Sequence, residues 1–252
     1  MRLLSYNMLD GGGGREELLD RVIESQQPDV VALVEADDPD VVSRLARQLE
    51  MDFIHAPGNS KASALLSRPP IVETINHALL HPQLTKSLLE ATVMAGEEWI
   101  IGAVHLHARA TEEDEKVRER EIAEVLRIFE PYREAGRPHL LAGDFNANAP
   151  YQRIDPMRCK PSTREAWQAN GGYIPRRVVQ RVLDAGYLDS LRVVDPASAE
   201  TAGTFSTEFP GQRVDYIFTF GVDPSRLRNA RIIYDPPARE ASDHYPILLD
   251  VA

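Results

Sequence analysis

Short apolar runs alternate with amphipathic segments over the first fifty residues. The runs at 2–6 and 29–34 have the length and composition of buried strands. In the segments 15–27 and 40–50, apolar residues recur at the three-to-four-residue spacing of a helix with one buried face. The pattern therefore predicts that the chain begins strand, helix, strand, helix.

The pattern changes after residue 60, where strand-like runs follow one another closely. Strands are predicted at 62–66, 71–75, 88–94, 98–105, 139–145, 214–220, 230–234 and 245–251, and helices at 111–135 and 174–185. The sequence AGEE at 95–98 is predicted to form a hairpin turn. The segment 150–173 is rich in Pro, Arg and polar residues, and it is predicted to be an irregular insert. No shift in composition divides the chain, so we expect one α/β domain spanning residues 1–252, with more than one sheet.

Composition narrows the class of protein. No apolar run approaches the roughly 20 residues that cross a membrane, and no secretory signal is recognisable, so we expect no membrane span and a cytoplasmic location. Cys159 is the only cysteine, which excludes an internal disulfide and a thiolate zinc site. The formal net charge of -11 disfavours a broad, non-specific surface for nucleic acid, although it leaves room for a local basic groove.

The long charged run EEDEKVRERE at 112–121 lies inside the predicted helix 111–135. Alternating acids and bases on a helix are typical of a face that is in contact with solvent. We therefore expect this run to be a solvated helix face.

Polar residues with catalytic or metal-binding chemistry recur where predicted strands begin or end. They are Asn7, Glu35, His105, Asp144, Asn146, Asp215, Asp243 and His244. Each alone has a structural explanation as a turn or cap residue. Their number favours a shared site, in which hard oxygen donors suit Mg²⁺ or Mn²⁺ better than zinc.

The same residues stand in a recognisable order of motifs. The set SYN, Glu35, VHL, GDFNA, RVDYIF and SDHYP resembles the endonuclease/exonuclease/phosphatase superfamily from Asn7 to His244, and SRPPI at 67–71 resembles the segment before its middle hairpin. The resemblance implies a four-layer α/β/β/α sandwich. In this fold two mixed sheets pack face to face, helices lie outside, and the active site lies at one rim.

The resemblance also implies roles for the individual residues. Glu35 is implied as the principal ligand of a divalent metal, with Asn7 and Asp243 at the same centre. Asp144 is implied to orient or deprotonate the attacking water or to help hold a second metal, and Asn146 to hydrogen-bond a phosphoryl oxygen. Asp215 is implied to orient His244, and His105 to be a second imidazole over the phosphate.

Some residues near these motifs depart from the family pattern or have two explanations. Val34 stands where the family often has Gln, and Asp37 and Asp38 follow the metal-ligand position, where they also suit the N-cap of the helix near residue 40. His107 shares a strand face with His105 by the period of two, yet it is equally explained as a surface residue. Arg109 is a candidate for contacting phosphate.

The residues and the resemblance together predict a metal-dependent phosphodiesterase of the nuclease kind, which acts on a phosphate ester and has DNA or RNA as one candidate substrate. Basic residues such as Arg153, Arg158 and Lys160 lie among aromatic residues in the insert, which is typical of single-strand binding but also of a charged surface loop. Alternatives are a phosphatase or phospholipid phosphodiesterase, and a non-catalytic binding module of the same fold. No obligate protein partner is predicted.

The run of glycines at 11–14 is not a nucleotide-binding loop, because neither the P-loop nor the dinucleotide pattern fits it. Two explanations remain for it. The glycines either let the chain turn from the rim into its helix without crowding a substrate, or are flexible slack.

Overall fold

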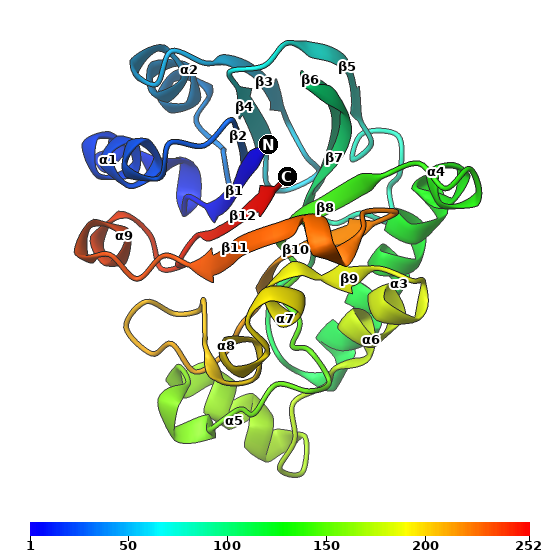
Figure 1. The fold of residues 1–252 in the computed structure, drawn as a ribbon. Helices are drawn as coiled ribbons and strands as arrows, with labels where there is room; N and C mark the ends of the chain where they lie inside the picture. Colours follow the sequence, from blue (N-terminus) through cyan, green and yellow to red (C-terminus); the bar gives the residue numbers. More distant parts are fainter.

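Two six-stranded sheets form the centre of the computed structural model, which describes residues 1–252 (Figure 1). The first sheet contains, in spatial order, β11 (Leu227–Ile232), β12 (Ile247–Val251), β1 (Arg2–Asn7), β2 (Val30–Val34), β4 (Ser63–Ser67) and β3 (Asp52–Ala56). The second contains β5 (Ile71–Asn76), β6 (Ser87–Ala95), β7 (Glu97–His105), β8 (His139–Asp144), β10 (Asp215–Phe220) and β9 (Leu188–Asp189). Both sheets are mixed, because β1 runs parallel to β2 and β7 runs parallel to β8, whereas the other neighbours are antiparallel.

Helices lie on the outer side of each sheet (Figure 1). The first sheet is covered by α1 (Glu16–Gln26), α2 (Pro39–Gln48) and α9 (Pro236–Ala241), and the second by α3 (Glu112–Ile128) and α6 (Arg177–Asp184). The shorter elements are η1 (Asp10–Gly12), α4 (Glu130–Glu134), η2 (Pro156–Arg158), α5 (Pro161–Ala169), α7 (Ser190–Val194), α8 (Pro196–Thr201) and η3 (Pro224–Arg226). No helix is long and apolar enough to cross a membrane.

Strand alternation in β8 shows how the layers pack. Leu140 and Ala142 belong to the large apolar cluster shared with the first sheet, whereas Leu141 between them packs with the apolar residues of α3 and α6. Each central strand of the second sheet thus buries one face against the other sheet and the opposite face against helices. The predicted four-layer sandwich is confirmed.

Two predictions of helix and loop segments are wrong. The helix predicted over 111–135 is two helices, since α3 ends at Ile128 and α4 contains Pro131, which has no N–H for the helical ladder. The segment 150–173 is not irregular throughout, because α5 occupies nine of its residues. Pro161 stands in the first turn of α5, where the missing N–H costs nothing.

Several short elements lie outside the predicted pattern. The strand β3 and the helices α7, α8 and α9 are absent from the prediction, and the strand predicted at 230–234 runs from Leu227 to Ile232. Elements of five or six residues have little intrinsic stability and form because of the packing around them.

The four glycines at 11–14 divide into two pairs. Gly11 and Gly12 are buried and have positive φ, and a Cβ on Gly12 would lie 2.6 Å from side-chain atoms of both Met8 and Leu19. A Cβ on Gly13 or Gly14 would meet nothing within 4 Å. The first pair is therefore required by close packing, and only the second pair is unconstrained by its surroundings.

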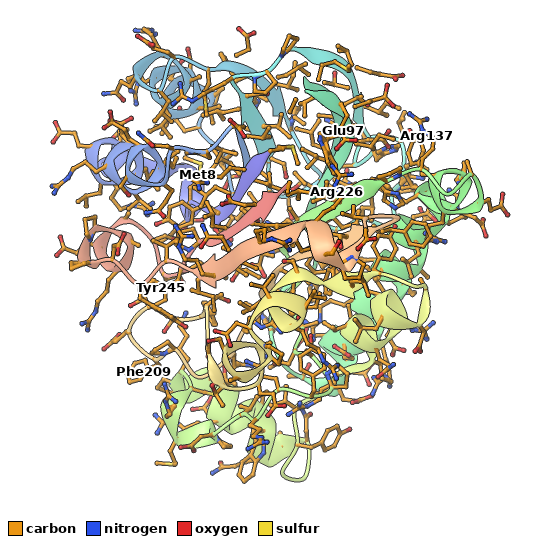
Figure 2. The ribbon with its side chains drawn as sticks, in the orientation of Figure 1. Met8, Glu97, Arg137, Phe209, Arg226 and Tyr245 are labelled. Atoms are coloured by element: carbon orange, nitrogen blue, oxygen red, sulfur yellow. The ribbon has the colours of Figure 1, made fainter.

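The ends of the two sheets are tied together away from this loop. The turn predicted at 95–98 is confirmed, since β6 and β7 pair up to Ala95 and Glu97, with Gly96 at positive φ. Glu97 in this turn forms an ion pair with Arg226, which directly precedes β11 of the other sheet (Figure 2).

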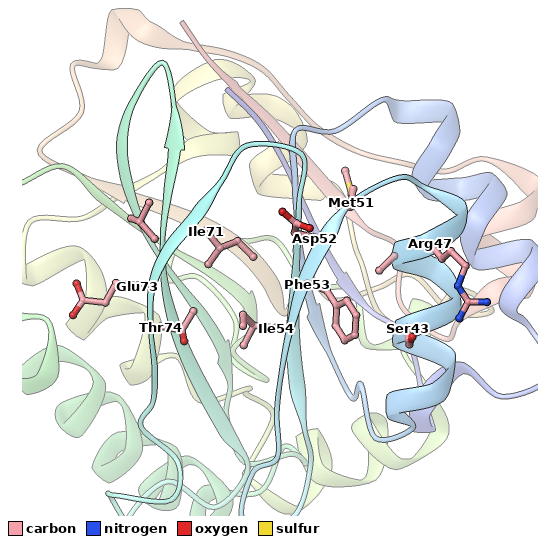
Figure 3. Close-up of a pocket in the computed structure, with 11 residues that line it drawn as sticks. Ser43, Arg47, Met51, Asp52, Phe53, Ile54, Ile71, Glu73 and Thr74 are labelled. Carbon is pink, nitrogen blue, oxygen red and sulfur yellow. The ribbon is translucent and has the colours of Figure 1, made fainter.

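A hollow of about 650 Å³ lies between α2, β3 and β5 (Figure 3), and it contains none of the predicted site residues.

His139 at the start of β8 makes stability depend on pH. Its ring is fully buried, contacts Phe129 and Phe220 in stacked geometry and reaches the hydroxyl of Tyr187, and burial lowers its pKa to about 4. The native state thus binds fewer protons than the unfolded chain between pH 6.5 and pH 4. The contribution of His139 to the free energy of unfolding is therefore complete above pH 6.5. It is lost as the pH falls through this window, which lowers the free energy of unfolding by about 2–3 kcal/mol.

We expect His139→Gln to remove this part of the acid destabilisation. Urea unfolding between pH 7.5 and pH 4.5 measures it, with a shallower loss of stability in the variant than in the wild type. An identical pH slope in both proteins would contradict the assignment.

Candidate active site

Three of the predicted residues form one row across the second sheet. His105 pairs in register with Asp144, and Asp144 pairs in register with Asp215, so the three side chains lie on the same face of neighbouring strands. That face is the inner one, since Ala103 and Ala142, two residues earlier in β7 and β8, belong to the cluster shared by the two sheets. The row is buried and faces the first sheet.

The first sheet brings Asn7 and Glu35 to the same place. Asn7 ends β1, and its Nδ2 lies 3.4 Å from Oε1 of Glu35 and 3.2 Å from Oδ2 of Asp144. Glu35 directly follows β2 with a φ of 54°, a left-handed conformation that non-glycine residues adopt where the surroundings impose it. Beside the site a hydrogen bond of 2.6 Å between the hydroxyls of Ser63 and Ser87 joins the sheets.

Asp144 is the group that the other residues share. His105 Nε2 lies 3.4 Å and His244 Nε2 3.8 Å from its Oδ2, and the backbone N–H of Asn146 donates to its Oδ1. Burial alone would raise the pKa of Asp144, but the two imidazoles and Lys86 outweigh burial and hold its pKa well below the ordinary value. Asp144 is therefore a carboxylate at neutral pH.

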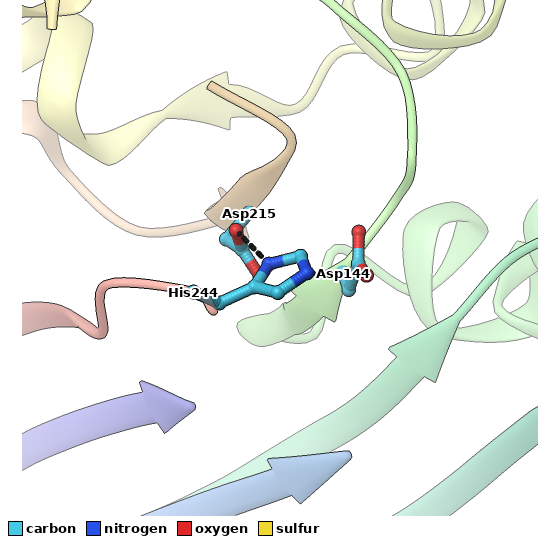
Figure 4. A group of neighbouring side chains, drawn as sticks. All are labelled: Asp144, Asp215 and His244. Atoms are coloured by element: carbon cyan, nitrogen blue, oxygen red, sulfur yellow. Dashed lines mark hydrogen bonds and ion pairs between the residues drawn. The ribbon is translucent and has the colours of Figure 1, made fainter. Parts of the chain in front are cut away.

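Asp215 and His244 form a hydrogen-bonded pair beside it (Figure 4). Nδ1 of His244 lies 2.9 Å from Oδ2 of Asp215, which leaves Nε2 on the side of Asp144. Burial lowers the pKa of His244, yet the carboxylates of Asp215 and Asp144 reverse this effect and raise it to about 10. Burial raises the pKa of Asp215. The pair consequently carries a proton at neutral pH.

The turn after β8 fixes Asn146. Gly143 has a φ of 143°, and a Cβ there would lie 2.0 Å from the carbonyl oxygen of Val104, so only glycine lets β8 approach β7 this closely. Asn146 itself has a φ of 48°, and its Nδ2 donates to the carbonyl oxygen of Leu106. The amide is therefore held against both strands at the rim.

Asp243 lies at the edge of the group. It occupies a bend before β12, so strand alternation does not separate it from His244, and its Oδ1 is 3.9 Å from His244 Nε2. Its other charged neighbour is Lys160, at 3.7 Å. The structure thus brings all eight predicted residues into one contact network, with Asp243 joined to it through His244 and not through Asn7 or Glu35.

Two lysines in this network were not predicted. Lys61 Nζ lies 3.3 Å from Glu35 and 2.9 Å from Asp37, and also contacts Asp10. Lys86 Nζ lies 2.6 Å from Nε2 of His105, and burial lowers the pKa of this lysine. Neither lysine belongs to a motif, and each comes from a loop that only the fold brings to the rim.

The donor groups fit a hard divalent cation. Carboxylate oxygens of Asp10, Glu35 and Asp37 lie within 4.8 Å of one another, as do ligand atoms of Asp144, Asp215 and His244. Lys61 contacts the carboxylates of Asp10, Glu35 and Asp37, which shows that this part of the rim favours positive charge. The buried Asp144, Asp215 and His244 can also hold a metal ion.

Comparison with known proteins agrees with this geometry. The family model described as Endonuclease/Exonuclease/phosphatase family matches residues 4–244. The chain belongs to this family. Exodeoxyribonuclease III of Haemophilus influenzae is 25% identical to this chain in an alignment of 274 positions, which covers 98% of this chain and 98% of that protein.

Solved structures show the same fold. The 3′ phosphatase NExo from Neisseria, bound to a product DNA hairpin, superposes with a TM-score of 0.74 at 19% identity over 100% of this chain and 99% of that chain. An AP endonuclease from Archaeoglobus fulgidus gives a TM-score of 0.74 at 16% identity, with 100% and 99% covered.

In this family member, the charged run on α3 is not simply a solvated face. Glu115, Arg118 and Glu121 are at most 2% exposed, which corrects the prediction for one stripe of the helix. Arg118 pairs with Glu115 at 3.0 Å, and its Nη1 donates to the carbonyl oxygens of three successive loop residues, His107, Ala108 and Arg109. These buried charges are spaced three residues apart in the sequence, so they lie on one face of the helix, and this spacing could have indicated a buried stripe.

Glu121 holds two segments that flank the site. One carboxylate oxygen accepts hydrogen bonds from the N–H and hydroxyl of Thr85, next to Lys86, and the other accepts from the N–H of His107. The side chain of His107 pairs with Asp114, at 2.9 Å, so His107 belongs to this supporting network and not to the row of His105.

Asp38 caps α2, as its position before the predicted helix suggested.

We expect Glu121→Gln to destabilise the protein by about 1–3 kcal/mol, because an amide nitrogen cannot accept from the N–H groups that the carboxylate satisfies. Glu113→Gln is the matched control, since Glu113 lies on the same helix with its side chain 80% exposed. Urea unfolding measures both variants. Equal stability of the two would show that Glu121 does not hold these loops.

Proposed function

We propose that the chain is a divalent-metal-dependent phosphodiesterase of the nuclease kind, which hydrolyses a phosphate ester by attack of water. The observation that carries the proposal is the contact network around Asp144, in which carboxylates, an amide and two imidazoles from both sheets converge at one rim. Membership of the family and the similarity to exodeoxyribonuclease III support phosphoester chemistry. The DNA-bound relative supports a nucleic acid as the first substrate class to test.

In this proposal, Glu35, Asn7 and Asp243 hold Mg²⁺ or Mn²⁺, with Asp10 and Asp37 close to Glu35. A bound divalent ion neutralises charge on the phosphate and polarises its oxygens. Asp144, ionised and hydrogen-bonded to the backbone of Asn146, accepts a hydrogen bond from the attacking water and orients it.

The remaining residues stabilise charge on the phosphoryl oxygens. Asp215 fixes the orientation of His244, whose protonated ring is a donor for a non-bridging oxygen. The side chain of Asn146 supplies a neutral donor from a rigid backbone. His105 contributes a second imidazole. Burial lowers its pKa, and its Nε2 lies next to Nζ of Lys86.

One observation favours the second candidate, a phosphatase or phosphodiesterase for a small phosphate ester. Several arginines in the insert or just after it, for which polyanion binding was one of two explanations, are already paired within the protein. Arg153 contacts Glu200, Arg177 contacts Glu112 and Glu119, and Arg176 donates to backbone carbonyl oxygens. A long nucleic-acid footprint on the insert is correspondingly less favoured.

Substitution of the central groups tests the proposed chemistry. We expect Glu35→Gln and His244→Ala each to lower hydrolysis of bis-para-nitrophenyl phosphate by about a hundredfold or more. The first change removes a charged ligand of the proposed metal, and the second removes a hydrogen-bond donor to the phosphate. Glu73→Gln, an exposed acid on β5, is the matched control and should keep full activity.

Circular dichroism and thermal melting establish that the variants fold. Near-full activity of both folded variants would overturn the proposal. No hydrolysis by the wild type of any ester in a panel of DNA, RNA, lipid and inositol phosphates would favour a non-catalytic binding module.

A further inference from the structure

A pocket of about 390 Å³ lies beside Asn146, a volume within the range of small-ligand sites. Its walls are the loop that follows β7, the helix α5 of the insert, and the chain around Phe205. It therefore adjoins the amide that we propose to contact the phosphate. A group esterified to that phosphate can enter it.

The charge of this pocket is opposite to that of the whole chain. Of its 12 lining residues, Arg109 and Lys160 are charged and none is Asp or Glu, although the protein carries a net charge of -11. The carboxylates of Asp10, Glu35 and Asp37 gather elsewhere at the rim. The pocket is thus a local positive region next to an acidic centre.

Arg109 is presented to the pocket without a competing partner. Its side chain forms no ion pair and no hydrogen bond, in a protein where most cations near the insert are paired. Its backbone has a φ of 76° and is held by Arg118, which donates to its carbonyl oxygen. The buried charges of α3 therefore hold the backbone from which this unpaired guanidinium extends.

Lys160 links the pocket to the catalytic histidine. Its Nζ lies 4.5 Å from the ring centroid of Phe205, whose ring in turn lies 4.7 Å from that of His244. Asp243 is the only acid within 4 Å of Lys160 Nζ, at 3.7 Å, which leaves ammonium protons free to face the pocket. Thr163 anchors α5 in this position through a hydrogen bond of 2.9 Å to Gln212.

We propose that this pocket receives the group esterified to the scissile phosphate, and that Arg109 and Lys160 select a group carrying a second anionic centre. Charge-assisted hydrogen bonds from a guanidinium and an ammonium are the strong contacts for phosphate oxygens. The second anion is either the additional phosphate of a small ester or the next phosphodiester of a nucleic-acid strand. The inference rests on the proposed function, since it assigns the substrate class of the same site.

Two substrates that differ only in the second anion test the selection. They are thymidine 5′-(para-nitrophenyl phosphate) and the same ester with a 3′-phosphate. A single-stranded oligonucleotide is the third substrate. We expect Arg109→Gln and Lys160→Gln each to lower kcat/KM about tenfold more for the 3′-phosphorylated ester or the oligonucleotide than for the ester without the second phosphate. Arg120→Gln is the matched control, because Arg120 is an exposed cation on the outer helix α3 that forms no ion pair and does not line the pocket.

The two arms separate the sources of the anion. Dependence on Arg109 and Lys160 with the small ester identifies a free second phosphate, whereas dependence only with the oligonucleotide identifies a strand. Equal losses for all three substrates, or no loss for any, would overturn the selection.

Binding without turnover separates this inference from the proposed function. Isothermal titration of thymidine 5′-monophosphate and thymidine 3′,5′-bisphosphate, in buffer containing Ca²⁺, should show about tenfold tighter binding of the bisphosphate to the wild type. The preference should disappear in the double variant Arg109→Gln, Lys160→Gln. This result from a protein that hydrolyses none of the substrates would support the pocket and refute the phosphodiesterase, whereas equal affinities in the wild type would refute the pocket.

Discussion

The buried carboxylate of Asp144 is the point on which the candidate site depends. A charge this deeply buried is unfavourable unless polar groups surround it, and the groups that do so come from both sheets. Asn7 reaches it from the first sheet, His105 from the neighbouring strand of the second, and His244 from the chain before β12. The packing of the two sheets and the geometry of the site therefore depend on each other, because a shift of one sheet against the other would separate Asp144 from Asn7 and His244.

The strand period accounts for much of what the sequence predicted. His105, Asp144 and Asp215 each end or begin an apolar run, and the period of two places them on the face that the apolar residues bury. The resemblance carried by the order of motifs correctly implied the four-layer sandwich, and the structure places all eight residues in one contact network.

The failures have a different physical origin. Lys61 and Lys86 lie in loops without periodicity, so only the folded chain shows that they contact Glu35 and His105. The helix α5 is short, and the polar composition around it resembles a loop. Arg118 was misassigned because a charged residue on a helix usually faces water, whereas here the buried partner is the backbone of the adjacent loop.

The rim has two electrostatic regions, to which the proposed function assigns separate tasks. The carboxylates around Glu35 favour a cation, while the pocket beside Asn146 contains only positive charge. An acidic protein can in this way bind an anionic ester without a broad basic surface. The supporting charges of α3 hold the loop between these regions, which makes them part of the site without touching the substrate.

Metal dependence of hydrolysis tests the central claim most directly. The measurement is the rate of release of para-nitrophenol from bis-para-nitrophenyl phosphate by the wild-type protein with Mg²⁺ or Mn²⁺, with excess EDTA, and after the metal is restored. The account predicts hydrolysis that EDTA abolishes and added metal recovers. Hydrolysis unaffected by EDTA would contradict it.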